Sequence, residues 1–344
     1  MRHLASIREI KEILPHNNAD SLELAIVDGW QVIVRKGEFS PGQKVIYFEI
    51  DSVLPVLPQF EFLRKSCHRN QPWLPNGEGF RLRTIKLRGE ISQGLIVPIS
   101  SCFGYDLELG LDITDMLGVV KWDPPVPTQL QGLAKSNFPS FISKTDQERI
   151  QNLLRELEEH RNIHSFEVTM KLDGSSFTCY RNEGQFGVCS RNMELKLEGN
   201  ENNAFVKMFL ESGLKDFMES IPESMNFAIQ GELMGPGIQG NRENFTENRL
   251  YIFDVFDINN QRYMLPLERR NFINAGLPYI KNVFHVPVIH ENFTITTESV
   301  ADLLKMAEGP SINNPVREGL VWKCSEINFS FKTISNKFLL NEKD

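Results

Sequence analysis

Short apolar runs separated by turn residues dominate the first third of this chain. Several of these runs alternate apolar and polar positions with a period of two, which is typical of strands that bury one face. Asp28-Gly29 and Ser40-Pro41-Gly42 lie between successive runs and predict tight turns. The pattern predicts a small all-β domain, a barrel or a sandwich. Its strands are expected at residues 22–27, 30–34, 45–50, 80–87 and 95–99.

The remainder of the chain mixes apolar strands with amphipathic helices. Thr145 and Glu148 have the spacing of a capping box, and Ile150, Leu153 and Leu157 follow at helical spacing, so a helix is predicted from Thr145 onward. Further helices are expected at 203–210, from Pro266 and at 300–307. The expected strands are 168–172, 177–180, 186–190, 227–233, 251–258, 318–323 and 329–334. The pattern predicts an α+β domain with antiparallel sheets and flanking helices.

A proline-rich stretch, Lys121-Trp122-Asp123-Pro124-Pro125-Val126-Pro127, lies between these two patterns. Proline favours extended, stiff backbone, so the stretch is expected to connect two domains. We place a β domain at residues 1–120, a linker at 121–135 and the α+β domain at 136–344.

Composition narrows the classes of protein that fit. The 344 residues are 41% hydrophobic, which is enough for a proper core in two domains. The net charge of -8 argues against a generic nucleic-acid coat, so any nucleic-acid surface must be a local basic patch. Five scattered cysteines form no paired spacing, and no run approaches the length of a membrane span. A soluble, intracellular protein with reduced thiols is expected, and no obligate protein partner is evident.

The segment Val168-Thr169-Met170-Lys171-Leu172-Asp173-Gly174 carries the first candidate chemistry. Side chains alternate along a strand, so Lys171 and Asp173 are expected on one side with Leu172 behind them. Gly174 allows the backbone to turn or to approach a ligand closely. Alone, such a short motif is more often a surface hairpin than a site.

Other charged residues share the unusual setting of Lys171, because each lies in or at the end of an apolar strand. Charge in such a position is costly unless it is paired or bound to a ligand. The set therefore indicates one shared pocket. Its members are Lys171, Asp173, Arg191, Glu232, Glu318 and Lys332, with an aromatic residue near Phe253.

In their order and local sequence these residues resemble the nucleotidyltransferase motifs of the ATP-dependent ligase and capping-enzyme superfamily. Six motifs match across about 160 residues, which is far more specific than one short motif. They are Lys171-Leu172-Asp173-Gly174, Ser190-Arg191-Asn192, Gly231-Glu232-Leu233, Phe253-Asp254-Val255-Phe256, Arg317-Glu318-Gly319-Leu320-Val321 and Phe331-Lys332. A preceding β domain with Leu4-Ala5-Ser6-Ile7, Glu49-Ile50-Asp51-Ser52 and Phe60-Glu61-Phe62-Leu63-Arg64 resembles RNA ligases that have an N-terminal OB domain.

The resemblance implies an ATP-dependent RNA ligase that joins 3′-hydroxyl and 5′-phosphate ends of RNA, for which RNA repair is the expected setting. By resemblance, Lys171 attacks the α-phosphorus of ATP and forms lysyl-AMP. A neighbouring carboxylate stabilises the ammonium form of lysine, so the acids are expected to serve a divalent cation instead. The implied metal set is Asp173, Glu232 and Glu318, with Mg²⁺ or Mn²⁺ lowering the pKa of Lys171.

The remaining implied roles concern the nucleotide. Lys332 is expected at the α-phosphate and Arg191 at the ribose, a phosphate or the RNA end. Phe253, with Phe256 as the alternative, is expected to stack on adenine, and Glu232 has a ribose hydroxyl as its alternative partner. Lys144 and Arg149 flank the start of the predicted helix, where anions are favoured, and are expected at the pyrophosphate.

Two departures from the family pattern limit what can be carried over. Ile334 stands where a second lysine is common, so either Lys337 compensates or Lys332 acts alone. Met170 precedes the nucleophile where an acid is frequent, so no side-chain role is carried over to that position.

The β domain contains a second, shorter likeness. Residues 87–95 resemble the strand–turn segment of tRNA-binding OB-fold domains. Cations and aromatic rings suited to RNA surround it, although an ordinary solvated strand face with core aromatics fits equally well. They are Arg81, Arg83, Lys86 and Arg88, with Trp30, Trp73 and Phe80.

Three other functions stay open at this point. Two are enzymes of the same superfamily, a DNA ligase and a GTP-using capping guanylyltransferase. The third is a non-catalytic RNA-binding protein whose β domain is the functional part. The presence of all five charged residues, Lys171, Asp173, Glu232, Glu318 and Lys332, argues against the third.

Overall fold

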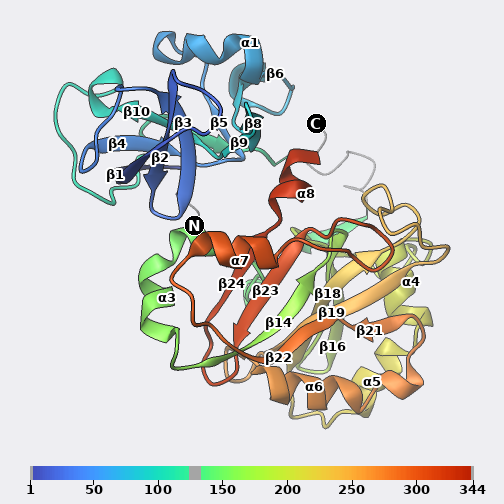
Figure 1. Cartoon of the computed structure of the whole chain (residues 1–344). Helices are drawn as coiled ribbons and strands as arrows, with labels where there is room; N and C mark the ends of the chain where they lie inside the picture. Colours follow the sequence, from blue (N-terminus) through green and yellow to red (C-terminus); the bar gives the residue numbers. More distant parts are fainter. Residues whose placement is uncertain (1–2, 124–132, 342–344) are drawn as a thin grey trace. The chain divides into compact units, whose positions relative to one another are not determined.

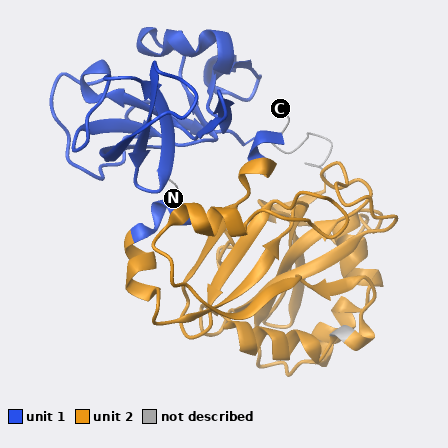
Figure 2. Cartoon of the chain, viewed as in Figure 1, with its two compact units in different colours: residues 1–125, 150–154, 339–344 blue, residues 126–149, 155–338 orange. Residues whose placement is uncertain are grey.

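The computed structural model describes residues 3–123 and 133–341, which form two compact units (Figures 1 and 2). Unit 1 comprises residues 1–125, 150–154 and 339–344, and unit 2 comprises residues 126–149 and 155–338. The predicted linker at 121–135 lies mostly outside the described residues, although its last two residues already belong to a strand of unit 2. Among the helices described, none combines the length and apolarity needed to cross a membrane.

Unit 1 is built around a five-stranded antiparallel sheet, in agreement with the predicted all-β domain. β1 pairs with β4 through its first half and with β2 through its second half. A bulge between Ile10 and Glu12 lies at the start of the half that pairs with β2, where bulges typically bend a strand. The strand order is β10 (Leu95–Pro98), β4 (Lys44–Phe48), β1 (Ala5–Pro15), β2 (Leu22–Val27) and β3 (Trp30–Arg35).

A second sheet and a separate hairpin complete the strands of unit 1. The second sheet has the order β11 (Val120–Lys121), β5 (Ser52–Leu54), β7 (Glu78–Arg81) and β6 (His68–Asn70). The hairpin is β8 (Ile85–Leu87) with β9 (Glu90–Ser92), so the single strand predicted at 80–87 is interrupted. The short helical segments are η1 (Pro58–Leu63), α1 (Arg64–Cys67), η2 (Pro75–Gly77) and η3 (Ile99–Ser101).

Residues 150–154 belong to unit 1 although they follow a strand of unit 2. The backbone N–H of Gly29 donates to the carbonyl of Gln151 at 3.1 Å. Asn152 accepts from Trp30 Nε1 at 2.7 Å and donates to Glu49 Oε1 at 2.7 Å. This segment is therefore held by specific hydrogen bonds inside a unit from which it is distant in sequence.

The prediction of a helix that begins at Thr145 is wrong. Glu148 and Arg149 form β13 (Glu148–Arg149), which is followed by η4 (Ile150–Asn152) and only then by α3 (Leu154–His160). β13 pairs in parallel with β24, and Ile150 is fully buried. Strand pairing and burial over long sequence distances have overridden a local capping signal.

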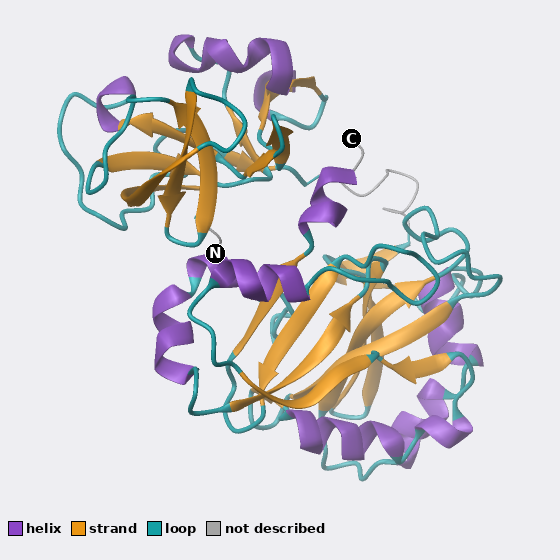
Figure 3. Ribbon diagram, in the orientation of Figure 1, coloured by secondary structure: helices purple, strands orange, loops and turns teal. Residues whose placement is uncertain are grey.

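Unit 2 contains two mainly antiparallel sheets, as predicted (Figure 3). Within its described residues the exceptions are the parallel pairs β13–β24 and β19–β21. The larger sheet follows the order β12 (Ala134–Asn137), β17 (Met193–Leu195), β16 (Gln185–Cys189), β15 (Ser175–Asn182), β18 (Phe227–Met234), β19 (Arg249–Asp257) and β20 (Arg262–Tyr263), with β21 (Val283–His285) beside β19. The smaller sheet follows β13, β24 (Ser330–Ile334), β23 (Gly319–Cys324), β14 (Ser165–Lys171) and β22 (Val288–Thr294).

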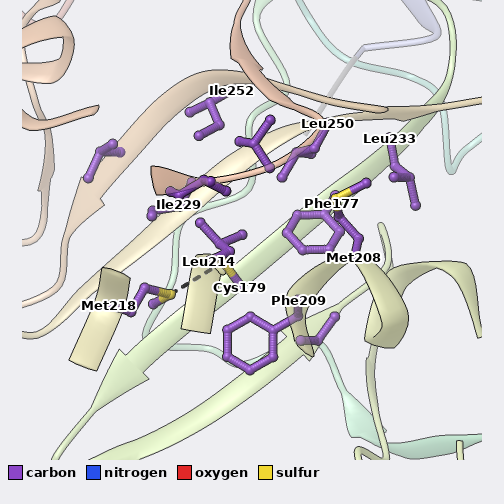
Figure 4. Close-up of a cluster of buried hydrophobic side chains, with 14 of the residues drawn as sticks. Phe177, Cys179, Met208, Phe209, Leu214, Met218, Ile229, Leu233, Leu250 and Ile252 are labelled. Carbon is purple, nitrogen blue, oxygen red and sulfur yellow. Dashed lines mark hydrogen bonds between the residues drawn. The ribbon is translucent and has the colours of Figure 1, made fainter. Parts of the chain in front are cut away.

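Helices pack on the larger sheet and enclose the main core of unit 2 (Figures 1 and 4). They are α4 (Ala204–Glu211), α5 (Leu214–Ser220) and α6 (Pro266–Asn274). Asn203 caps α4 by accepting from the N–H of Phe205 at 2.9 Å, which fits the predicted helix start. Buried side chains of this core include Phe177, Phe209, Met218, Ile229 and Ile252. The remaining helical segments are η5 (Leu277–Tyr279), α7 (Val300–Met306) and α8 (Asn336–Asn341).

Candidate active site

β14, β23 and β24 place two of the predicted cationic residues on one face of the smaller sheet. Thr169 lies opposite Val321, which in turn lies opposite Lys332. Residues in register share a face, and Lys171 is two residues after Thr169, so Lys171 and Lys332 project to the same side. The fold thus brings together two lysines that are separated by 161 positions in the sequence.

Lys171 is held by Glu318, which directly precedes β23. The Nζ atom lies 2.7 Å from each carboxylate oxygen of Glu318, and both side chains are partly buried. Burial by itself lowers the pKa of Lys171, but the charges of Glu318, Glu232 and Asp173 outweigh burial and raise it. Lys171 is therefore a protonated ammonium at neutral pH in this state.

The turn after Lys171 joins the two sheets of unit 2. The N–H of Gly174 donates to Glu232 Oε1 at 2.9 Å, and Glu232 lies in β18 of the larger sheet. A side chain at Gly174 would collide with the carbonyl of Leu233. Burial raises the pKa of Glu232 to about 7, against the opposing effect of Lys171.

Asp173 is paired with a residue that the sequence analysis missed. Arg242 Nη1 lies 3.0 Å from Asp173 Oδ2, and the Arg242 guanidinium also lies over the ring of Phe338, 4.5 Å from its centroid. Arg242 is in a loop with no strand periodicity. The loop glycines Gly235, Gly237 and Gly240 were the one local signal that the backbone there is specialised.

The predicted metal set fits a hard divalent cation in its chemistry. Mg²⁺ and Mn²⁺ prefer carboxylate oxygens, and Asp173, Glu232 and Glu318 supply them. Each acid also acts on the pKa of Lys171, and Glu318 and Asp173 raise that of Glu232, as expected where acids crowd one place. In the described part of the chain these three do not appear among groups whose ligand atoms all lie within 4.8 Å. The three acids outnumber the two cations paired with them, Lys171 and Arg242, so a divalent cation suits their charge.

The predicted phosphate-binding cations gather around residues 144–146. Asp146 lies 3.4 Å from Lys332 Nζ and 3.8 Å from Arg191 Nη2. Lys144 Nζ lies 3.2 Å from Asn192 Oδ1, next to Arg191 in the chain. Asp146 was not foreseen from the sequence, because its apparent place was inside a helix that does not form.

Arg149 differs from its predicted setting. It lies in β13 opposite Lys332 and its side chain is buried, so it does not flank an exposed helix start. Lys144 precedes a strand as well, and a helix dipole therefore supports neither residue. Their expected contact with pyrophosphate stays a prediction.

The two candidate adenine-stacking rings have different surroundings. Phe256 is 3% exposed and packs in a core cluster with Tyr180 and Ala228. Phe253 is partly buried and lies against the cluster that contains Met170 and Leu172, on either side of Lys171. Of the two, Phe253 is therefore the ring that packs against the chain neighbours of Lys171.

The structure also describes Ile334, which stands where the family commonly has a second lysine, and the predicted substitute Lys337. Ile334 is buried, 4% exposed, and its partner across the ladder is Gly319. Lys337, the predicted substitute, lies 2.7 Å from Glu308 Oε2. Its ammonium is thus engaged by a carboxylate outside the predicted set.

In unit 1 several residues expected to contact RNA are part of the interior. Trp30 and Phe80 are fully buried, so of the two alternatives left open the core one holds for them, and they do not stack on bases. Arg81 is 3% exposed and lies under the ring of Trp122, 4.4 Å from its centroid. These side chains fill the space between strands, where apolar rings pack best.

Other members of that set stay accessible. Lys86 and Arg88 are exposed on the β8–β9 hairpin, and Trp73 is partly exposed with its ring 4.9 Å from that of Trp122. Arg83 is partly exposed as well.

Comparison with known proteins agrees with this geometry. A family model described as RNA ligase matches residues 164–335, and one described as an OB-fold domain matches residues 4–99. The chain belongs to the RNA ligase family. This confirms the resemblance drawn from the six motifs and identifies the β domain as an OB fold. No match was found among curated proteins.

Solved structures of an RNA ligase are similar over almost the whole chain. A variant of Naegleria gruberi RNA ligase with AMP and Mn has 39% identity and a TM-score of 0.91, covering 100% of both chains. The same protein with PPi has 39% identity and a TM-score of 0.90, covering 98% of both chains. Another variant with ATP and Mn has 38% identity and a TM-score of 0.90, covering 98% of this chain and 99% of that chain.

Proposed function

We propose that this RNA ligase uses ATP and a divalent cation to join a 3′-hydroxyl to a 5′-phosphate of RNA, through lysyl-AMP and adenylylated RNA. The observation that carries the proposal is the Lys171–Glu318 pair, 2.7 Å apart, beside the turn that delivers Asp173 and meets Glu232. The similar Naegleria gruberi structures with ATP, AMP and Mn support the choice of nucleotide and metal class.

In the first step Lys171 Nζ attacks the α-phosphorus of ATP. A phosphorus–nitrogen bond forms, the bond to the pyrophosphate oxygen breaks, and the ammonium proton must leave before attack. The acids around Lys171 oppose that loss because they raise its pKa. A divalent cation bound by Asp173, Glu232 and Glu318 supplies the positive charge that lowers the pKa of Lys171 and offsets charge on the α-phosphate.

Side chains of unit 2 position the nucleotide in this proposal. Lys332 contacts the α-phosphate, Arg191 holds the ribose, a phosphate or the RNA end, and Phe253 stacks on adenine. Lys332 and Arg191 both face Asp146, and phosphate oxygens of the nucleotide compete with that carboxylate for them. Lys144, with Arg149 behind it in the chain, serves the departing pyrophosphate.

The later steps move the adenylate to RNA. The 5′-phosphate attacks lysyl-AMP, which frees the lysine, and the 3′-hydroxyl then displaces AMP to form the phosphodiester. We assign RNA holding in part to the β8–β9 hairpin of unit 1, because Lys86 and Arg88 are exposed there. RNA repair is the process that such end joining serves.

Mass spectrometry of the intact protein tests the first step. With ATP and Mg²⁺ we expect one added AMP, which peptide analysis locates on Lys171. Lys171→Ala should acquire none, whereas Lys207→Ala, which removes an exposed lysine of α4, should label normally. Labelling with GTP in place of ATP would indicate a capping-type enzyme, and absence of any adduct with every nucleotide and metal would refute the proposal.

Nicked duplexes test the end chemistry. We expect sealing when the 3′-hydroxyl strand is RNA and the 5′ end carries a phosphate, and none when the 5′ end is a hydroxyl. Equal sealing of an all-DNA nick would instead favour a DNA ligase. Lys86→Ala with Arg88→Ala should weaken RNA binding while lysyl-AMP formation stays unchanged.

A further inference from the structure

A second group of metal-ligating side chains lies at the other end of β14 from Lys171. Cys324 Sγ lies 3.2 Å from Glu326 Oε2, and His164 Nδ1 lies 3.6 Å from the same oxygen. Within the described residues this is the one group of three or more such side chains whose ligand atoms all lie within 4.8 Å of one another. It has no part in the proposed ligation chemistry.

Two segments of unit 2 that are distant in sequence bring these residues together. His164 follows α3, where its N–H donates to the carbonyl of His160 at 3.1 Å. Cys324 ends β23 and lies opposite Phe166 in the ladder. Ser325 N–H donates to the carbonyl of Ser165 at 2.9 Å, which fixes the two segments against each other. The ligand atoms are therefore placed by the backbone and do not depend on long, mobile side chains alone.

Two separations among the three ligand atoms fit one small tetrahedral ion, and the third is within 4.8 Å. Zinc binds sulfur at about 2.3 Å and nitrogen or oxygen at about 2.1 Å, so its ligand atoms lie roughly 3.4–3.6 Å apart. The distance from Glu326 Oε2 is 3.2 Å to Cys324 Sγ and 3.6 Å to His164 Nδ1, and both are close to the distances between ligands of a tetrahedral zinc ion. A thiol, an imidazole and a carboxylate together favour zinc over magnesium, which takes oxygen ligands.

Neighbouring groups support the same role. Ser165 Oγ donates to Glu326 Oε1 at 2.8 Å, which orients the carboxylate and leaves Oε2 toward the histidine and cysteine. The ring of His160 lies 5.3 Å from that of His164, so a second imidazole is next to the group. It can supply the fourth ligand by a change of rotamer, or water can.

We propose that His164, Cys324 and Glu326 bind Zn²⁺ in a structural site that ties the end of α3 to the turn between β23 and β24. Binding forms a sulfur–zinc bond and releases the thiol proton of Cys324 to solvent. The site is distinct from the nucleotide pocket, because six residues of strand between Ser165 and Lys171 span about 20 Å. A hydrogen-bond network closing the sheet end is the competing explanation.

Cobalt(II) is the probe that separates the two explanations. Metal-free full-length protein in excess Mg²⁺ should take up one equivalent of Co²⁺ with a thiolate-to-cobalt absorption band, and Zn²⁺ should abolish the band. The carboxylates of the nucleotide pocket cannot produce a thiolate band, so the presence or absence of this band does not depend on the proposed ligation chemistry. Absence of the band at stoichiometric Co²⁺ overturns the site.

Variants locate the site. Cys324→Ser should remove the band, and His164→Ala and Glu326→Gln should weaken Co²⁺ binding at least about tenfold. Glu326 is exposed, so Glu326→Gln keeps the test valid if Cys324→Ser does not fold. Cys102→Ser, in unit 1, and Asp173→Asn, in the nucleotide pocket, should keep the band. A band that survives Cys324→Ser, or that Cys102→Ser removes, refutes the assignment.

Thermal unfolding provides a second measurement. Zn²⁺ should raise the unfolding midpoint of the wild type and of Asp173→Asn, because it binds only the folded state. It should raise that of Glu326→Gln by clearly less at the same Zn²⁺ concentration, because the variant binds the ion more weakly. Equal stabilisation of all three proteins would contradict the site.

Discussion

Two lysine–carboxylate pairs of unit 2 differ in what surrounds them. Lys171 and Glu318 lie at one end of β14 and β23, with 27% and 15% of their side chains exposed. Lys323 and Asp254 lie deeper, with 9% and 3% exposed, and Lys323 Nζ also donates to the carbonyl of Phe253 at 2.5 Å. The first pair is therefore the more exposed of the two.

The second pair belongs to a buried charged cluster, which we define as Glu167, Asp254, Arg269 and Lys323. Arg269 and Glu167 are fully buried and form an ion pair, and Arg269 Nη1 lies 3.9 Å from Asp254. Burial lowers the pKa of Lys323 to about 8, against the effect of Asp254. Because β14, β19, β23 and α6 each contribute a residue, the cluster connects both sheets and a helix.

The two pairs differ in how far burial is offset by neighbouring charges. At the exposed end, acids exceed the cations that face them, and the pKa of Lys171 is raised. In the interior, desolvation dominates and the pKa of Lys323 falls. Changes at the exposed end should therefore affect catalysis, and changes in the cluster should affect stability.

The largest expected effect is that of Glu318→Gln on lysyl-AMP formation. If Glu318 serves the metal, the rate should fall about 100-fold, or about 3 kcal/mol, with the unfolding midpoint unchanged. If Glu318 were only an ion-pair partner, its neutralisation would ease deprotonation of Lys171 and raise the rate. Single-turnover labelling measures the rate, and Glu308→Gln, whose partner is Lys337, serves as the control that should label normally.

The second-largest expected effect is that of Arg269→Met on stability. The substitution leaves Glu167 buried with only the more distant Arg270 as a cationic partner. Removing one member of a buried ion pair typically costs about 3–5 kcal/mol of unfolding free energy. Arg270 lies 3.5 Å from the other oxygen of Glu167, which places the expected loss at the lower end. Denaturant unfolding measures the loss.

Arg155→Met removes an exposed arginine that pairs with Glu159, and it should leave stability nearly unchanged. Folded Arg269→Met should still form lysyl-AMP. A variant that is as stable as the wild type but cannot be labelled would assign the cluster to catalysis and reverse the comparison.

The smallest effect concerns His285, beside the same cluster. Burial, with a contribution from Arg269, lowers the pKa of His285 to about 4. The unfolded chain, with a pKa of about 6.5, then binds the proton more tightly, so stability is lost as pH falls below that value. Between pH 7 and 5 this residue should account for a loss of about 1–2 kcal/mol.

Urea unfolding of wild type and His285→Gln at both pH values measures that loss, because the variant should lack it. His290→Gln removes an exposed histidine of β22 and should retain the wild-type pH dependence. Identical pH dependence in all three proteins would show that His285 is not held neutral.

The sequence by itself determined the kinds of domain and the six motifs. Alternation along the strand predicted that Lys171 and Asp173 share one side, and the strand register shows that Lys332 lies on the face of Lys171. The same alternation places Glu167 on that face too, although Glu167 is fully buried. Periodicity therefore identified which side chains share a face, but not which charged side chains on that face are buried.

Only the tertiary structure decided how deeply each side chain is buried and which residues distant in sequence it contacts. It paired Arg242 with Asp173, moved Trp30 and Phe80 into a core, and replaced a capped helix with β13. It also brought His164 within reach of Cys324 and Glu326. The physical reason is that local signals are worth about 1 kcal/mol each, whereas burial and strand pairing between distant segments sum over many residues and prevail.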